Sequence, residues 1–170
     1  MKKLPIGIQN IEKILANDEY VYIDKTGFAY RLIDEGIPHY FLSRPRRFGK
    51  SLFVNTLEHI FKGNKELFKG CQIYESDYDW QEHPVLHFDF SQIASTTCEE
   101  LKENLQDYVT KIASSFGASL EGRSIQIRLS SLIETLAKKN KVVVLVDEYD
   151  KPIINNLNNL EVAKQNRKLM

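Results

Sequence analysis

Three consecutive residues, Gly49, Lys50 and Ser51, are of the types that hold the phosphates of a nucleotide. A glycine lets backbone N–H groups approach phosphate oxygens, a lysine reaches the β- and γ-phosphates, and a hydroxyl holds Mg²⁺ at the start of the next helix. The usual phosphate-binding loop, or P-loop, reads G-x-x-x-x-G-K-[ST], whereas this chain reads R-P-R-R-F-G-K-S, with Arg44 at the first glycine position. The tripeptide alone is common by chance, and it also suits a helix start with an exposed lysine.

A second segment, VVVLVDEYD at 142–150, complements this loop. Its apolar run ends in Asp147 and Glu148, which is the pattern of a Walker B strand. The aspartate of such a strand binds Mg²⁺ through water, and the glutamate polarises the attacking water. The alternative is a solvated turn after a buried strand. Because one segment supplies phosphate contacts and the other supplies metal and water contacts, their joint occurrence favours nucleotide chemistry.

Strands alternate with helices along the chain, which predicts an α/β fold: a parallel sheet with flanking helices. Ligands of such sheets bind beyond the carboxyl ends of the strands. We therefore expect the strand ending at Arg44 and the strand ending at Asp147 to be parallel, with both motifs at one edge. The apolar run 142–146 indicates a strand buried on both faces. The expected strands are 20–23, 38–44, 83–91 and 142–146, and the expected helices are 8–15, 27–34, 50–64, 97–116 and 125–141.

Length and composition suit one domain over residues 1–170. Lysine plus arginine (23) equals aspartate plus glutamate (23), so any nucleic-acid surface would have to be a local patch. No stretch approaches about 18 apolar residues and no signal peptide is visible, so we expect a cytoplasmic protein that does not enter membranes. Three core strands are few for this fold, and the segment after Pro152 is polar. We therefore expect the N-terminal part of a longer protein.

Five segments occur in an order that resembles a known family. They are YVYIDKT (20–26), YFLSRPRRFGKSL (40–52), KELFKG (65–70), PVLHFDFS (84–91) and VVLVDEYDKPI (143–153). Over roughly residues 4–160 the chain resembles the AAA-ATPase-like family of bacterial and archaeal P-loop proteins. R-P-R-R-F-G-K-S and D-E-Y-D-K-P are similar to that family's forms of Walker A and Walker B. The resemblance implies a P-loop NTPase-like parallel sheet, truncated here after the Walker B strand. Many members continue into a C-terminal nuclease-like domain of the PD-(D/E)XK type.

The resemblance also implies roles for particular residues. Lys50 and Glu148 are the catalytic candidates, and Ser51 and Asp147 are the candidate Mg²⁺ ligands. The implied ligands are ATP and Mg²⁺. The residues expected to contact the nucleotide are Arg46, Arg47, Phe48, Gly49, Lys50, Ser51 and Leu52.

Several residues near these motifs keep two interpretations. Arg46 and Arg47 either add charge to the phosphates or pair with an acidic neighbour such as Asp150, whose own role is open. The segment Asp24, Lys25 and Thr26 either lies near the nucleotide or forms a structural turn. Asp89 ends another strand and is interpreted as a solvated or capping carboxylate.

Three functional hypotheses follow. The first is an ATP-binding P-loop domain that hydrolyses MgATP to ADP and phosphate when complete. The second is a non-hydrolysing, nucleotide-gated module that controls an attached nuclease-like domain or a partner. The third is a nucleic-acid-binding fragment that uses Arg44, Arg46 and Arg47, and the zero net charge makes it the weakest. The sequence does not predict the oligomeric state.

Overall fold

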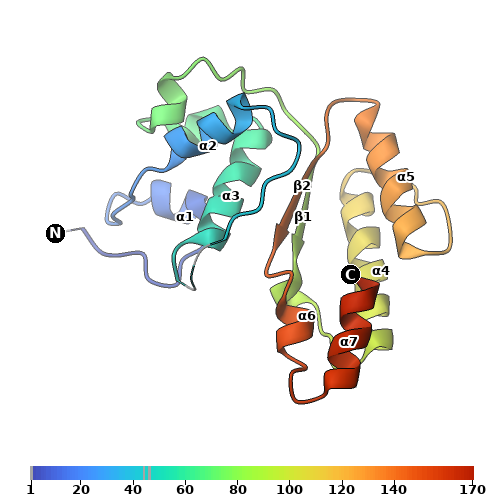
Figure 1. Cartoon of the computed structure of the whole chain (residues 1–170). Helices are drawn as coiled ribbons and strands as arrows, with labels where there is room; N and C mark the ends of the chain where they lie inside the picture. The colour runs from blue at the N-terminus through green and yellow to red at the C-terminus, as the bar shows by residue number, and fades with distance from the viewer. Residues whose placement is uncertain (1, 44, 46) are drawn as a thin grey trace. The chain divides into compact units, whose positions relative to one another are not determined.

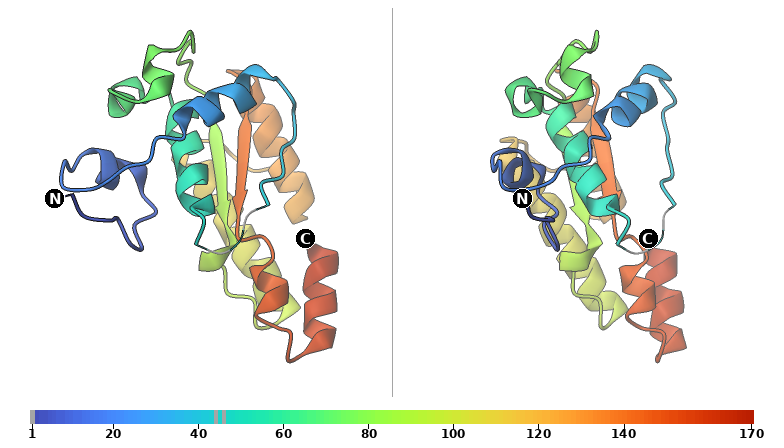
Figure 2. Two further views of the ribbon diagram at one scale, coloured as in Figure 1. Left: turned by 60° about the vertical axis from the view of Figure 1, so that its left-hand side comes forward. Right: turned by 90° about the vertical axis from the view of Figure 1, so that its left-hand side faces the viewer.

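The computed structural model describes residues 2–43, 45 and 47–170. The chain divides into two compact units, Met1–His83 and Pro84–Met170. Figures 1 and 2 show the helices and strands that make up each unit. The single domain expected over residues 1–170 stays a prediction. Among the described residues, no helix has the length and hydropathy needed to cross a bilayer.

The first unit is helical throughout its described core. Its α-helices are α1 (Ile11–Leu15), α2 (Thr26–Asp34) and α3 (Lys50–Phe61), and its short 3-10 helices are η1 (Lys65–Phe68) and η2 (Gln72–Glu75). Side chains from all five elements meet in one buried cluster: Ile11, Ala29, Phe53, Ile60, Phe68, Cys71 and Ile73.

Helix α3 forms because its buried residues Phe53, Thr56 and Ile60 recur at helical spacing on one face. The helix ends at Phe61, three residues before the end of its expected range, and Gly63 follows with a left-handed φ of 71°. A Cβ on Gly63 would also lie only 3.0 Å from the Trp80 carbonyl oxygen. Both the backbone angle and this close approach therefore require glycine at the end of α3.

The prediction of two strands in the first unit was wrong. The segment 20–23 makes only an isolated parallel bridge, between Lys3 and Tyr20. The segment 38–43 is not a strand, its Phe41 side chain is 74% exposed, and Arg44 lies outside the described residues. An apolar run becomes a strand only when a neighbouring strand satisfies its backbone groups, and the described residues of this unit supply none.

The start of the first helix also differs from the expectation. The apolar pattern predicted a helix from residue 8, whereas α1 begins at Ile11. The Asn10 side chain accepts a hydrogen bond from the Lys13 N–H at 2.9 Å, which caps the helix at that point.

The second unit is built on a two-stranded parallel sheet. Strands β1 (Val85–Asp89) and β2 (Val143–Asp147) pair in register from Val85 opposite Val143 to Asp89 opposite Asp147. Figure 1 shows the two strands side by side. The remaining elements are η3 (Phe90–Gln92), α4 (Cys98–Ser115), α5 (Ile125–Ala137), α6 (Lys151–Ile154) and α7 (Leu160–Leu169). The general α/β class is confirmed, with two described strands in place of the three expected for the core.

Helices α4 and α5 cover one face of this sheet, the face that carries Leu86 and Phe88 of β1. Both helices lie within their expected ranges, and Val109 of α4 and Leu132 of α5 belong to the same buried cluster. The capping side chains are Thr97 for α4 and Ser124 for α5. The Glu100 carboxylate accepts from the Thr96 N–H at 2.8 Å, and the Glu100 N–H donates to the Thr97 hydroxyl at 3.1 Å.

The expectation that β2 is buried on both faces was wrong. Val144 is 45% exposed and Val146 is 47% exposed. The physical reason is the strand number: among the described residues β2 has one neighbour, so it is an edge strand and not the centre of a wide sheet.

The segment from Lys151 onwards folds into two helices that the sequence did not predict, α6 and α7. Figure 2 shows α6 and α7 side by side. The Asn156 amide donates to the Ser95 carbonyl at 2.6 Å and to the Pro152 carbonyl at 3.0 Å. The fully buried Asn166 amide donates to the same two carbonyls, at 3.2 and 2.9 Å. This pair of asparagines, the amide clamp, joins the loop after β1 to both helices.

His59 gives the first unit a pH dependence. It is 8% exposed, and its Nδ1 lies 2.9 Å from the Asn64 amide nitrogen, an arrangement that suits a neutral ring. Burial lowers the His59 pKa below its ordinary 6.5, although Glu12 and Glu58 partly oppose the shift.

Protonation of His59 is harder in the folded state than in the unfolded state. We therefore expect neutral His59 to make its full contribution to the free energy of unfolding above the ordinary pKa of 6.5. This contribution should decrease as the pH falls below 6.5 towards the lower folded pKa. Urea denaturation at about pH 7.5 and about pH 5 measures this loss, and His59→Gln should reduce it. The exposed His39→Gln is the matched control, and an equal acid loss in wild type and His59→Gln would contradict the prediction.

Candidate nucleotide-binding site

The predicted phosphate loop leads into helix α3 through a left-handed glycine. Gly49 is the N-cap residue, with φ 72° and ψ 30°, so Lys50 and Ser51 are the first two residues of the helix. Helices α4 and α5 are capped by side-chain oxygens, but glycine offers no such acceptor to the N–H groups of the first turn. The first turn of α3 also contains no acidic residue, so its positive dipole end is left for an anion.

The other loop residues face solvent where the structure describes them. Arg47 is exposed and has a left-handed φ of 67°, and Phe48 is exposed beside it. Lys50, Ser51 and Leu52 are half-buried on α3. Two of the predicted loop residues, Arg44 and Arg46, lie outside the described residues. The pairing of Arg46 or Arg47 with Asp150 stays a prediction.

The segment Asp24, Lys25 and Thr26 forms the structural turn of its two interpretations, whereas a position near the nucleotide stays a prediction. The Asp24 carboxylate accepts hydrogen bonds from the Thr26 N–H (2.8 Å), the Thr26 hydroxyl (2.7 Å) and the Gln72 N–H (2.7 Å). The buried Thr26 hydroxyl accepts in turn from the Ile73 N–H at 3.1 Å. Asp24 and Thr26 therefore form a structural turn that fixes α2 against η2. The Lys25 side chain extends towards Gly49, and its ammonium lies 3.9 Å from the position that a Cβ would occupy on that glycine.

In the second unit, Asp147 and Glu148 stand at the carboxyl end of β2. Asp147 is buried, and its Oδ1 accepts from the Glu148 N–H at 3.0 Å. Glu148 has a left-handed φ of 52°, which is unusual for a residue with a Cβ. Its carboxylate lies 3.8 Å from the Lys151 ammonium. Asp150 is the N-cap position of α6 but makes no side-chain capping bond.

Asp89 lies opposite Asp147 in the sheet register, and its interpretation as a capping carboxylate is confirmed. It accepts from the Ser91 N–H at 2.9 Å and from the Gln92 amide at 2.7 Å. Burial opposes its ionisation, but these hydrogen bonds outweigh burial and lower the pKa of Asp89 below its ordinary value. The turn after β1 thus occupies this carboxylate, while Asp147 is the aspartate that the Walker B pattern singles out.

The structure brings together Gly49, Lys50 and Ser51 in one unit and Asp147 and Glu148 in the other. The meeting of the two groups at one sheet edge, and the shared Mg²⁺ site of Ser51 and Asp147, stay predictions. Among the described residues, no three His, Cys, Asp or Glu side chains are grouped to hold a metal. Mg²⁺ prefers several water and phosphate ligands beside one or two carboxylates, so a Ser–Asp pair suits an ion that arrives with a nucleotide.

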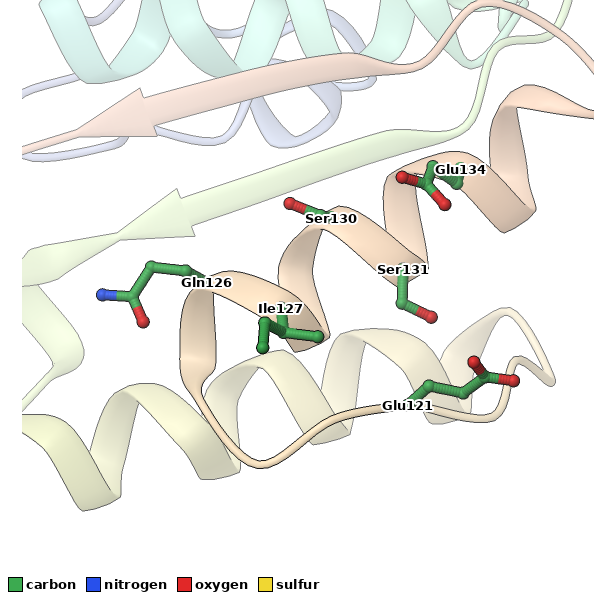
Figure 3. Close-up of a pocket in the computed structure, with 6 residues that line it drawn as sticks. All are labelled: Glu121, Gln126, Ile127, Ser130, Ser131 and Glu134. Carbon is green, nitrogen blue, oxygen red and sulfur yellow. The ribbon is translucent and has the colours of Figure 1, made fainter.

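A pocket beside α5 is separate from these motifs. It has a volume of about 320 Å³ and is lined by Glu121, Gln126, Ile127, Ser130, Ser131 and Glu134. Figure 3 shows Ser130 and Ser131 pointing to opposite sides of the helix. The lining has hydroxyls and carboxylates but no histidine, lysine or cysteine, and none of the predicted site residues belongs to it.

Comparison with known proteins identifies the family. The chain belongs to the AAA-ATPase-like family, whose model, described as "Predicted AAA-ATPase", matches residues 5–170. This confirms the resemblance seen in the sequence motifs.

A relative from Azotobacter chroococcum mcd 1, described as an uncharacterized protein in the vnfD 5' region, is 46% identical over 169 residues. The match covers 98% of this chain and 32% of the relative, so the chain spans about a third of that protein. No solved structure gives a significant match to the chain.

The left-handed backbone of Glu148 leads us to predict how two substitutions at this position affect stability. A Cβ in this conformation costs roughly 1 kcal/mol, which glycine avoids. We expect Glu148→Gly to be more stable than Glu148→Ala by about 1 kcal/mol in urea denaturation, although glycine is ordinarily the less stable of the two. Both variants lose the contact with Lys151, so the comparison isolates the backbone. Greater stability of the alanine variant would show that Glu148 is not strained.

Proposed function

We propose that this chain is the nucleotide-binding part of an ATPase that hydrolyses MgATP to ADP and phosphate. The observation that carries the proposal is the start of α3, where a left-handed Gly49 is followed by Lys50 and Ser51 in the first helical turn. Only this order places backbone N–H groups, an ammonium and a hydroxyl together at a positive helix end. Membership of the AAA-ATPase-like family supports it.

In the proposed reaction each residue has one task. Lys50 binds the phosphates, and Gly49 lets the backbone approach them. Ser51 and Asp147 hold Mg²⁺, which neutralises charge on the phosphate oxygens when it is bound. Glu148 orients the water that attacks the terminal phosphorus and accepts hydrogen bonds from it. Arg46, Arg47, Phe48 and Leu52 complete the nucleotide contacts in this proposal.

The proposal includes a P-loop fold with more core strands than the two that the described residues form. In the curated relative about two thirds of the length lies outside the match, which leaves room for further core strands and another domain. A nuclease-like domain controlled by ATP is the partner that the family resemblance suggests. The proposed location is the cytoplasm, where ATP is available.

Removing the loop lysine tests binding. We expect Lys50→Ala to bind ATP about 10–100-fold more weakly in titration calorimetry with Mg²⁺, because a charge-assisted phosphate contact is lost. Lys69→Ala, at an exposed lysine of the same unit, should bind like wild type. Equal affinity of Lys50→Ala and wild type would refute the phosphate loop.

Removing the carboxylate charge of Glu148 tests hydrolysis. We expect Glu148→Gln to keep ATP affinity within about twofold and to release phosphate at least 100-fold more slowly, the usual range for loss of a group that handles the attacking water. Glu134→Gln, at an exposed glutamate of α5, is the matched control. Tight ATP binding without phosphate release by the wild-type chain would instead select the nucleotide-gated module.

A further inference from the structure

Lys25 is distant from the phosphate loop in sequence but lies against it in the structure. Its ammonium is 3.9 Å from the Cβ position of Gly49, the glycine that begins α3. Both residues belong to the first unit, so this proximity is internal to one compact body. None of the roles implied by the sequence motifs requires a second lysine at this point.

The backbone on both sides of Lys25 is fixed. Asp24 and Thr26 bond to each other and to the N–H groups of Gln72 and Ile73. On the preceding side, the Tyr22 hydroxyl interacts with the Thr56 side chain of α3 and with the Lys25 backbone, and burial is the main reason that its pKa rises to about 12. The phenol thus remains protonated and neutral. These contacts tie the segment to the same helix that begins at Gly49.

The Lys25 ammonium forms no ion pair with a carboxylate among the described residues. Lys3, Lys62 and Lys151 each lie within 4.0 Å of a glutamate oxygen. Lys25 is exposed and makes no such ion pair among the described residues. Its ammonium lies instead near Gly49, at a positive helix end that has no acidic residue in its first turn. A cation near this end is unfavourable until an anion neutralises it.

We propose that Lys25 is a second phosphate-binding residue of this site and acts beside Lys50 on the phosphate chain of the nucleotide. Asp24 and Thr26 are then positioning residues that hold Lys25 over Gly49. The inference rests on the proposed function and adds a specificity to it: two ammonium groups favour a nucleoside triphosphate over a monophosphate, because more phosphate oxygens can be paired.

The test compares Lys25→Gln, which keeps most of the aliphatic stem and removes the charge, with Lys25→Arg, which keeps the charge. Affinities for ATP and AMP are measured by titration calorimetry on the whole chain. We expect Lys25→Gln to bind ATP about tenfold more weakly and AMP within about twofold of wild type. Lys25→Arg should bind ATP within about threefold of wild type. Melting temperatures without nucleotide should match for all variants, since the side chain is exposed.

Two further variants separate the failure of this inference from that of the proposed function. Lys69→Ala reports the effect of removing a positive charge elsewhere in the unit. If Lys50→Ala weakens ATP binding while Lys25→Gln behaves like Lys69→Ala, the phosphate loop stands and the role of Lys25 is overturned. If neither Lys50→Ala nor Lys25→Gln changes ATP affinity, both proposals fall. Equal weakening of ATP and AMP by Lys25→Gln would overturn the triphosphate preference.

Discussion

Parallel pairing between β1 and β2 is the constraint on which the second unit depends. Parallel neighbours cannot be joined by a tight turn, so the chain between them must cross over, and α4 and α5 form that connection. The crossover buries Leu86 and Phe88 against both helices. The register then places Asp89 opposite Asp147, so both carboxylates lie at one end of the sheet. The Asp89 carboxylate accepts hydrogen bonds from the turn after β1, and Asp147 carries the predicted Walker B role.

In the first unit, the predicted site residues lie at the N-terminus of a helix, α3, and not at the end of a strand. The buried face of α3 anchors the helix in the core, while its N-terminus is capped by a residue without a side chain. Hydrogen bonds at Asp24 and Thr26 hold a second segment against η2. The two predicted motifs differ in their chemistry: the start of α3 offers N–H groups, an ammonium and a hydroxyl, whereas the end of β2 offers the carboxylates of Asp147 and Glu148.

Local signals account for the elements that the sequence predicted well. The helices α3, α4 and α5 have apolar stripes, and the last two also have capping side chains. Strand β2 coincides with a run of apolar, mostly β-branched residues, and β1 coincides with a largely apolar run that contains one histidine. The prediction of strands at 20–23 and 38–43 failed because the apolar character of a segment does not show whether a neighbouring strand is available to pair with it. Helix α7 was missed because one of its buried residues is Asn166, which a hydrophobic pattern cannot show.

The candidate site likewise has residues that the sequence predicted and features that it could not predict. Residue types and order were enough to nominate Gly49, Lys50, Ser51, Asp147 and Glu148, since each motif is contiguous. The left-handed backbone of Glu148 could not be predicted, because no glycine or asparagine marks the position. Nor could the orientation of Lys25, since it depends on contacts made to η2, a distant segment whose own sequence carries no functional motif.

The amide clamp affects how the second unit folds. Asn166 reaches the Ser95 carbonyl across 71 residues of sequence, and Asn156 reaches it across 61. Contacts between such distant residues require closure of long loops, which slows folding relative to a local helical hairpin. On the ribosome, β1 and α4 emerge long before the residues that tie them down. The contacts of Asn166 with the Ser95 and Pro152 carbonyls form only after α7 has been synthesised, so this helix must be present before the loop after β1 is held in place.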